Sequence, residues 1–181
     1  MYPTYSFNIL FLDSFSCITV ISHYLDIGSW DVSNVTNITN MFWGTSFNQD
    51  ISSWDVSSVI YMIATFVYTP FNQDLSNWNV SNVTAMSSMF SGSDFNQDIS
   101  SWDVANVTNM ANMFNETPFN QDISSWDVSN VTDMGGMFRD TPFNQDISSW
   151  DVSNVFDMGR MFHITTSYNQ DLSSWNVENV V

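Results

Sequence analysis

Aspartate recurs at regular intervals along this chain of 181 residues, and evenly spaced carboxylates could bind cations. Calcium takes about six to eight oxygen ligands, which stacked aspartates could supply. The nonapeptide repeats that bind calcium are glycine-rich, however, whereas this chain has six glycines in total. An aspartate before Ile-Ser-Ser-Trp can also accept hydrogen bonds from the amides two or three residues later and close a turn. We therefore predict turn-closing aspartates, no cofactor, and at most weak or diffuse Ca²⁺ binding for Asp26, Asp50, Asp74, Asp98, Asp122, Asp146 and Asp171.

Residues for enzymatic chemistry are scarce in this sequence. His23 and His163 are the two histidines, and Cys17 is the single cysteine. Neither a glycine-rich phosphate loop nor the ligand spacing of a zinc site occurs. No repeat differs chemically from the others in the way that an active site would require. The sequence therefore predicts a protein that is not an enzyme.

The spacing of these residues follows from an internal repeat. Phenylalanine opens the phrase Phe-Asn-Gln-Asp every 24 residues, and Tyr168 opens the last copy after an interval of 25. Tryptophan keeps the same period. We therefore divide the chain into a leader or N-terminal cap over residues 1–22 and a repeat array over residues 23–181. The array has six full repeats (23–46, 47–70, 71–94, 95–118, 119–142 and 143–167) and a partial seventh.

One repeat, residues 119–142, gives the expected fold. Trp126 and Val128 alternate with polar residues, and a period of two is typical of a half-buried strand. The following apolar residues have the spacing of about two helical turns. Proline then ends the helix. The apolar residues of this helix are Val131, Met134, Met137 and Phe138.

A unit this short buries its apolar residues only by stacking on its neighbours. We therefore predict an α/β repeat fold. It is a leucine-rich-repeat-like solenoid with one short strand and one short helix per 24-residue coil, and a parallel sheet on one face. Tryptophan and methionine belong to its core, where each indole N–H needs a hydrogen-bond partner.

Polar residues beside the predicted strand form the best candidate binding face. In the solenoid, residues that alternate with Trp126 and Val128 point outward and stack in columns, giving an acidic, hydroxylated surface. The alternative is that short polar side chains merely solvate an exposed sheet. The candidate residues are Ser53, Asp55, Ser57, Ser101, Asp103, Ser125, Asp127, Ser129, Ser149, Asp151 and Ser153.

Asparagine also forms a column and suggests two roles. The first is a ladder whose inward side chains bond to the backbone of neighbouring coils and satisfy buried amides. The second is glycosylation, because several asparagines begin Asn-x-Ser/Thr sequons, including Asn115. The ladder column comprises Asn48, Asn72, Asn96, Asn120, Asn144 and Asn169.

The charge of the chain limits its partners. Nineteen acidic residues and two arginines give a formal net charge of −17. Such a surface repels nucleic acids and anionic lipids, while cations, basic proteins and neutral glycans remain acceptable partners. No apolar stretch is long enough to span a bilayer. Asp13 interrupts the apolar leader, which also lacks basic residues, so we interpret it as a cap rather than a signal peptide.

The phrase FNQDISSWDVSNVTxMxxMF resembles the repeat of the BspA-like leucine-rich-repeat surface proteins over residues 23–181. Ile123, Trp126 and Val128 fit the first apolar places of the leucine-rich pattern, while Asn130 stands one place early. The resemblance implies an extracellular or cell-surface adhesion protein that binds a protein or glycan on another surface. The alternative is a structural subunit of an extracellular filament that assembles head-to-tail through uncapped solenoid ends.

Overall fold

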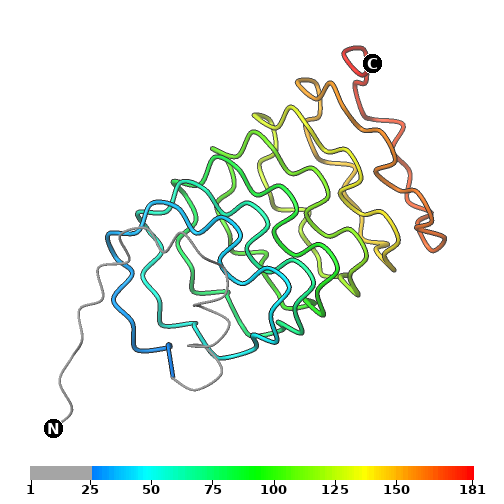
Figure 1. The fold of residues 1–181 in the computed structure, drawn as a ribbon. Helices are drawn as coiled ribbons and strands as arrows, with labels where there is room; N and C mark the ends of the chain where they lie inside the picture. The colour runs from blue at the N-terminus through cyan, green and yellow to red at the C-terminus, as the bar shows by residue number, and fades with distance from the viewer. Residues whose placement is uncertain (1–25) are drawn as a thin grey trace, which may run out of the picture.

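The computed structural model describes residues 26–181, which form a stack of coils. Figure 1 shows successive coils lying side by side, with residue 26 and Val181 at opposite ends of the stack. The 24-residue period of the sequence is the length of one coil, because hydrogen bonds join residues 24 or 25 positions apart in successive coils. The predicted cap over residues 1–22, together with Cys17 and His23, lies outside the described residues.

The predicted strand and helix are absent from the described part of the chain. Residues 26–181 contain no helix, and their β-structure consists of isolated parallel bridges. The α/β solenoid with a parallel sheet and one helix per coil was therefore a wrong prediction. The bridges form a single column, Asn37 to Tyr61, Tyr61 to Ala85, Ala85 to Asn109, Asn109 to Asp133 and Asp133 to Asp157.

Each coil is instead built from turns. In residues 119–142, backbone N–H groups close turns over 123–126, 128–131 and 134–137, with N···O distances of 3.1, 2.9 and 3.1 Å. A fourth turn over 138–141 is closed by the Thr141 hydroxyl, which donates to the Phe138 carbonyl at 2.7 Å. The phrase Phe-Asn-Gln-Asp links one coil to the next set of turns.

The last two turns of each coil exclude a helix because their third residue has a positive φ. Gly136 has φ 64° and Asp140 has φ 56°, as type II turns require at this place. A four-residue turn buries its first and fourth residues, so it reproduces the i, i+3 apolar spacing that predicts a helix. Equivalent positive-φ residues are Asn40, Gly44, Ala64, Tyr68, Ser88, Gly92, Asn112, Glu116, Arg160 and Ile164.

The apparent strand is the junction of two turns. Trp126 ends the first turn and Val128 begins the second, so both are buried while Asp127 between them is exposed. The Asp127 side chain accepts a hydrogen bond from the Ser129 amide at 3.0 Å. This local bond favours a turn over an extended strand.

Side chains hold much of the stack together. The indole N–H of Trp126 donates to the Ile99 carbonyl of the preceding coil at 3.1 Å, and the Asn130 side-chain amide (Nδ2) donates to the Ala105 carbonyl at 2.8 Å. These bonds pair carbonyls that have no sheet partner. The indole donors Trp54, Trp78, Trp102, Trp150 and Trp175 make the equivalent bond, so the predicted need for an indole partner is confirmed.

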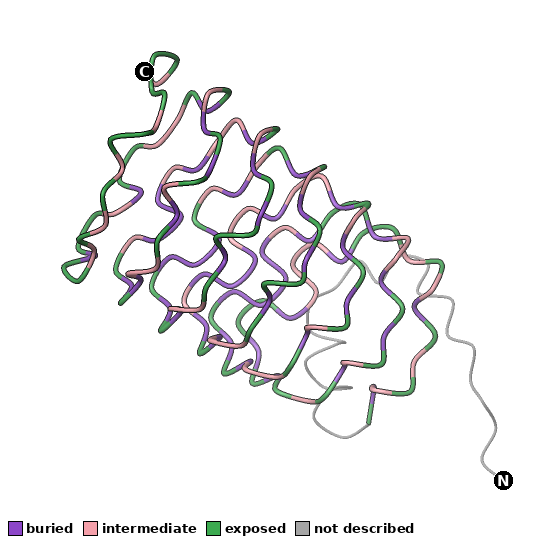
Figure 2. Cartoon of the chain, turned by 180° about the vertical axis from the view of Figure 1, so that it is seen from behind, coloured by how far each residue is buried: buried purple, intermediate pink, exposed green. Residues whose placement is uncertain are grey.

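The core is a continuous aromatic and aliphatic stack. Phe114 and Phe119 lie face to face with ring centroids 3.9 Å apart, and Phe114 lies 5.9 Å from Phe138 in the next coil. Figure 2 shows that buried residues recur at equivalent places in successive coils. Tryptophan and methionine of the inner coils are buried with them, as predicted. Trp43, outside the repeat register, is exposed.

Replacing Thr141 by valine is expected to lower the free energy of unfolding by about 1–3 kcal/mol, because two hydrogen bonds are lost in a buried place. Thr141 donates to the Phe138 carbonyl and accepts from the Phe143 amide at 3.4 Å. Urea denaturation measures the change.

Thr141→Ser is the matched control. Ser93 occupies the same place and makes both bonds, to the Phe90 carbonyl at 2.6 Å and from the Phe95 amide at 3.4 Å. Serine should therefore retain most of the stability. A larger loss for serine than for valine would show that the methyl group, and not the hydroxyl, stabilises the turn.

Candidate functional site

The predicted binding-face residues lie on the first two turns of each coil rather than on a sheet. Their shared feature is a place beside the buried Trp and Val positions, and we call this the acidic turn surface. Its exposed members are Ser53, Asp55, Ser101, Asp103, Ser125, Asp127, Ser149 and Asp151, while Ser57, Ser129 and Ser153 are half-buried.

Most polar groups of the acidic turn surface already serve the fold. The Ser125 hydroxyl donates to the Ser100 carbonyl of the preceding coil at 3.0 Å. Asp55 accepts both the amide and the hydroxyl of Ser57, at 3.1 and 2.6 Å. These bonds explain why the serine and aspartate recur without any ligand.

The second aspartate column closes turns, as predicted. The Asp122 side chain accepts the Ser124 amide at 2.9 Å, which is the bond expected of an aspartate before Ile-Ser-Ser-Trp. All seven members of the column make this bond, namely Asp26, Asp50, Asp74, Asp98, Asp122, Asp146 and Asp171.

The asparagine ladder is also present. The Asn144 amide donates to the Asn120 side-chain oxygen of the preceding coil at 2.9 Å, and Gln145 donates to the Asn120 carbonyl at 3.1 Å. The ladder lies at half-buried and exposed places, so the prediction of backbone bonds between coils is confirmed and the inward orientation is not. Its bonds run from Asn48 through Asn72, Asn96, Asn120 and Asn144 to Asn169.

Turn hydrogen bonds lower the pKa of several aspartates. The Ser57 hydroxyl and then its amide hold the pKa of Asp55 below the usual value, although the neighbouring charge of Asp31 opposes the shift. Hydrogen bonds from serine likewise lower the pKa of Asp31, Asp50, Asp98, Asp127, Asp146, Asp151 and Asp171. These carboxylates therefore stay ionised to a lower pH than an aspartate without such hydrogen bonds.

Stability is expected to fall as the pH drops below about 4. A lowered pKa in the folded state adds stability above the unfolded pKa, and protonation through the folded pKa removes it. Thermal unfolding between pH 7 and pH 2 at fixed ionic strength measures the loss.

Asp55→Asn should flatten this pH dependence, since Asn79 makes the same bond to the Ser81 amide at 3.1 Å. Stability that rises on acidification would instead show that relief of repulsion within the −17 chain outweighs the turn bonds.

The acidic residues form no metal centre in residues 26–181. No group of three or more His, Cys, Asp or Glu side chains in this part of the chain could hold a metal ion. A shallow depression between two coils has carboxylates from Asp122 and Asp146 alone, with Ser124, Gln145, Ser148 and Ser149 around them.

A different surface carries most of the chemical variety. It consists of the last two turns of each coil, where outward residues change from coil to coil, and we call it the variable turn surface. Its ranges are 36–44, 60–68, 84–92, 108–116, 132–140 and 156–164. Among the described residues, six of the eight exposed large apolar side chains lie here, namely Trp43, Ile60, Tyr61, Tyr68, Phe156 and Ile164.

The sequence indicates this surface only when the six repeats are compared with one another, and not in any single repeat. Aligned by coil, the third place of the fourth turn reads Gly, Tyr, Gly, Glu, Asp and Ile, whereas Phe-Asn-Gln-Asp is repeated almost unchanged. A side chain that differs between copies is not required by the fold that all copies share. Such a side chain can therefore serve a specific function, such as binding a partner.

Both arginines of the chain lie on the variable turn surface. Arg139 and Arg160 line a hollow of about 280 Å³ together with Gly135, Gly136 and Gly159. Asp133 and Asp157 line it as well, so the hollow has charges of both signs.

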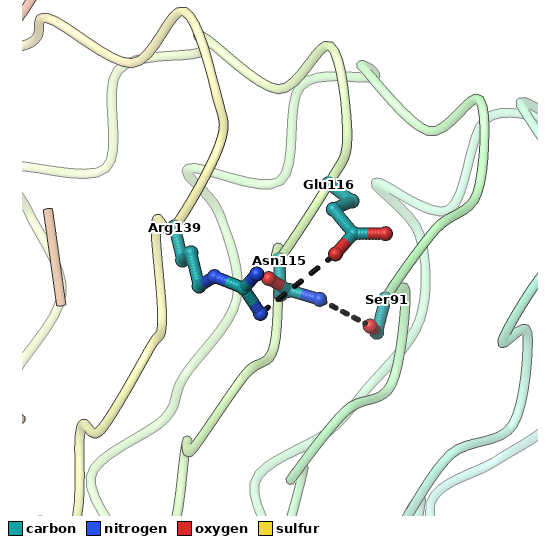
Figure 3. A network of polar contacts seen from close by, with 4 residues as sticks. All are labelled: Ser91, Asn115, Glu116 and Arg139. Carbon is teal, nitrogen blue, oxygen red and sulfur yellow. Dashed lines mark hydrogen bonds and ion pairs between the residues drawn. The ribbon is translucent and has the colours of Figure 1, made fainter. Parts of the chain in front are cut away.

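Figure 3 shows the polar contacts beside this hollow. Arg139 lies 3.8 Å from the Glu116 carboxylate, and the Asn115 side chain donates to the Ser91 hydroxyl at 3.1 Å. Within residues 26–181, the Arg139 Nε and the Asn115 Oδ1 are buried without a hydrogen-bond partner. Asn115 is 7% exposed, so its sequon lies in a place that a glycan could reach only if the coil opened.

Comparisons with known proteins identify a family and give no function. None of the described residues belongs to a helix that is long and apolar enough to cross a membrane. No curated protein and no solved structure matches the chain. The family model described as "Mycoplasma protein of unknown function, DUF285" matches residues 12–118 and residues 91–181. The chain therefore belongs to the DUF285 family, which is a BspA-like repeat family.

Proposed function

We propose that this protein is a non-catalytic interaction module at a cell surface or outside the cell, and that it recognises a protein or glycan through the variable turn surface. The observation that carries the proposal is the placement of exposed Trp and Tyr residues at the places where the coils differ. Tryptophan, tyrosine and arginine are the residues that contribute most binding energy at interfaces. The resemblance of the repeat phrase to that of BspA-like surface proteins supports the surface location.

The acidic turn surface has a different role in this proposal. Its hydroxyls and carboxylates stabilise turns and neighbouring coils, as in the bonds of Ser125 and Asp55. Its charge keeps the chain soluble and repels anionic partners. A surface that has the same residues in every coil offers many copies of one weak contact. Specific recognition of one partner requires residues that differ from coil to coil.

Retention on an array of extracellular matrix proteins and polysaccharides tests the proposal. A triple variant with Trp43, Tyr61 and Tyr68 replaced by alanine should lose roughly tenfold or more in affinity, because each exposed side chain supplies contact area. The matched control replaces Asp103, Asp127 and Asp151 by asparagine, which Asn79 shows to be compatible with the turn. No retention of the unmodified chain on any member would contradict the proposal.

The acidic turn surface is a second candidate because its carboxylates are exposed and ionised. Its partner would be a basic protein surface, bound with strong salt dependence. Binding to a basic test protein such as lysozyme at 0.05 and 0.5 M salt tests it. The triple aspartate-to-asparagine variant should lose this binding, while the triple alanine variant should retain it. The reverse result would show that the variable turn surface, and not the acidic turn surface, makes the contact.

A further inference from the structure

The variable turn surface has two chemically different halves. Residues 36–44, 60–68 and 84–92 contain no charged side chain, although the whole chain has a net charge of −17. The later coils place Glu116, Arg139 or Arg160 on the same surface. The first half is therefore a neutral area on a strongly acidic protein.

Aromatic side chains occupy this neutral area. Trp43 is 49% exposed and Tyr68 is 58% exposed, with Ile60 and Tyr61 also exposed in the same coil as Tyr68. We call these four residues the neutral aromatic patch. Exposed tryptophan and tyrosine are residue types that anchor partners at interfaces. Aromatic rings also combine an apolar face with a polar edge, so they suit ligands that are apolar on one side and wet on the other.

The Tyr68 ring is held in place by the next coil. A Cβ atom on Gly92 would lie 2.3 Å from the Tyr68 Cδ1, so the ring rests against a glycine backbone that leaves room for it. Gly92 has φ +67°, which glycine adopts without strain. A ring fixed before binding loses little conformational entropy when a ligand arrives.

Hydrogen-bonding groups accompany the aromatic rings. Asn37 is exposed and Asn40 and Ser88 are half-buried on the same surface. The Asn37 side-chain oxygen accepts the Thr39 amide at 2.8 Å, a bond that does not use its amide donors. The patch thus offers apolar faces with neutral donors and acceptors, and no ion to pair with.

We propose that the neutral aromatic patch binds a neutral polysaccharide. A sugar ring has an apolar C–H face that packs on an aromatic ring and a rim of hydroxyls that bond to amides and hydroxyls. A neutral chain also avoids the repulsion that the −17 charge imposes on acidic polysaccharides. The inference rests on the proposed function and specifies its ligand class and its location in residues 36–92.

Affinity electrophoresis of the full chain tests the inference. Native gels contain laminarin, dextran or mannan as neutral probes and alginate as the acidic probe. At least one neutral polysaccharide should retard the protein, and alginate should not. Trp43→Ala and Tyr68→Ala should each weaken this retardation roughly tenfold, since each removes an aromatic contact.

Phe156→Ala is the matched control, because Phe156 is also 49% exposed on the variable turn surface but lies among the charged coils. It should leave retardation unchanged. Thermal unfolding of each variant shows that the fold is intact, as expected for exposed residues.

Three results would overturn the inference. Retardation by none of the neutral polysaccharides is the first, and an equal loss for Phe156→Ala is the second. The third is a dimer by light scattering that Trp43→Ala converts to monomer, which would assign the patch to a second copy of this chain. Retention on matrix proteins in the array, without retardation by polysaccharides, would leave the proposed function intact and reject the glycan alone.

Discussion

Replacing Phe114 by alanine is expected to lower the free energy of unfolding by about 3–5 kcal/mol, which is the usual loss for a fully buried phenylalanine. Phe114 is completely buried in the middle of the stack. Its ring centroid lies 3.9 Å from that of Phe119 and 5.9 Å from those of Phe90 and Phe138. The cavity therefore removes contacts with the phenylalanine that opens the next phrase and with the rings of both neighbouring coils. Guanidinium denaturation followed by tryptophan fluorescence measures the change.

Two further substitutions separate burial from aromatic identity. Phe114→Leu keeps most of the volume and should lose less than alanine. Phe156→Ala removes an exposed ring and should change stability by no more than about 0.5 kcal/mol. A loss below about 1 kcal/mol for Phe114→Ala would mean that neighbouring coils close the cavity, and that the aromatic column is not a rigid core.

The core could be predicted from the sequence because burial depends on spacing alone. Residues such as Trp126, Val131 and Met134 are buried at the predicted places. Their local conformation could not be predicted in the same way, since helices and successive four-residue turns both bury residues three apart. Asn40 and Gly44 favour positive φ and indicated turns. Tyr68 and Ile164 occupy places equivalent to Gly44 and also have positive φ, although their side chains favour negative φ. Their residue types therefore gave no indication of a turn, because tertiary contacts override this preference.

Some bonds of the candidate sites could likewise be predicted from the sequence, and others could not. Turn-closing by Asp122 and the ladder of Asn120 were predictable, because they depend on local geometry or on the period. The bonds from the Ser125 hydroxyl and the Trp126 indole to the preceding coil could not be predicted in detail. They join residues 25 and 27 positions apart, and their geometry depends on turns where a strand and a helix were expected. The residues predicted as a polar binding face thus make bonds that stabilise the fold, and we therefore propose recognition at the places that vary between coils.

Deleting one whole coil should preserve the fold, whereas deleting half a coil should abolish cooperative folding. Without residues 95–118, the coil over 71–94 would lie against the coil over 119–142. Its Asn72 side chain would then accept the Asn120 amide, in the same geometry as the existing 2.9 Å bond to the Asn96 amide. Each coil contacts its neighbours alone, so one unit can be removed from a repeat array with a limited loss of stability.

Deleting residues 95–106 removes only the first half of that coil's column members, and it leaves residues 107–118 without the half of the coil that closes them. Phe90 would lose the Trp102 ring, whose centroid lies 6.3 Å from its own, although Phe114 would keep its 3.9 Å partner Phe119. The remaining turn residues could not bridge the stack, because every column would be displaced by 12 places. Near-ultraviolet circular dichroism and urea titration compare the two deletions with the intact chain. A sharp unfolding transition for the half-coil deletion would show that the turns fold locally, and that stacking in register is not the source of the cooperativity.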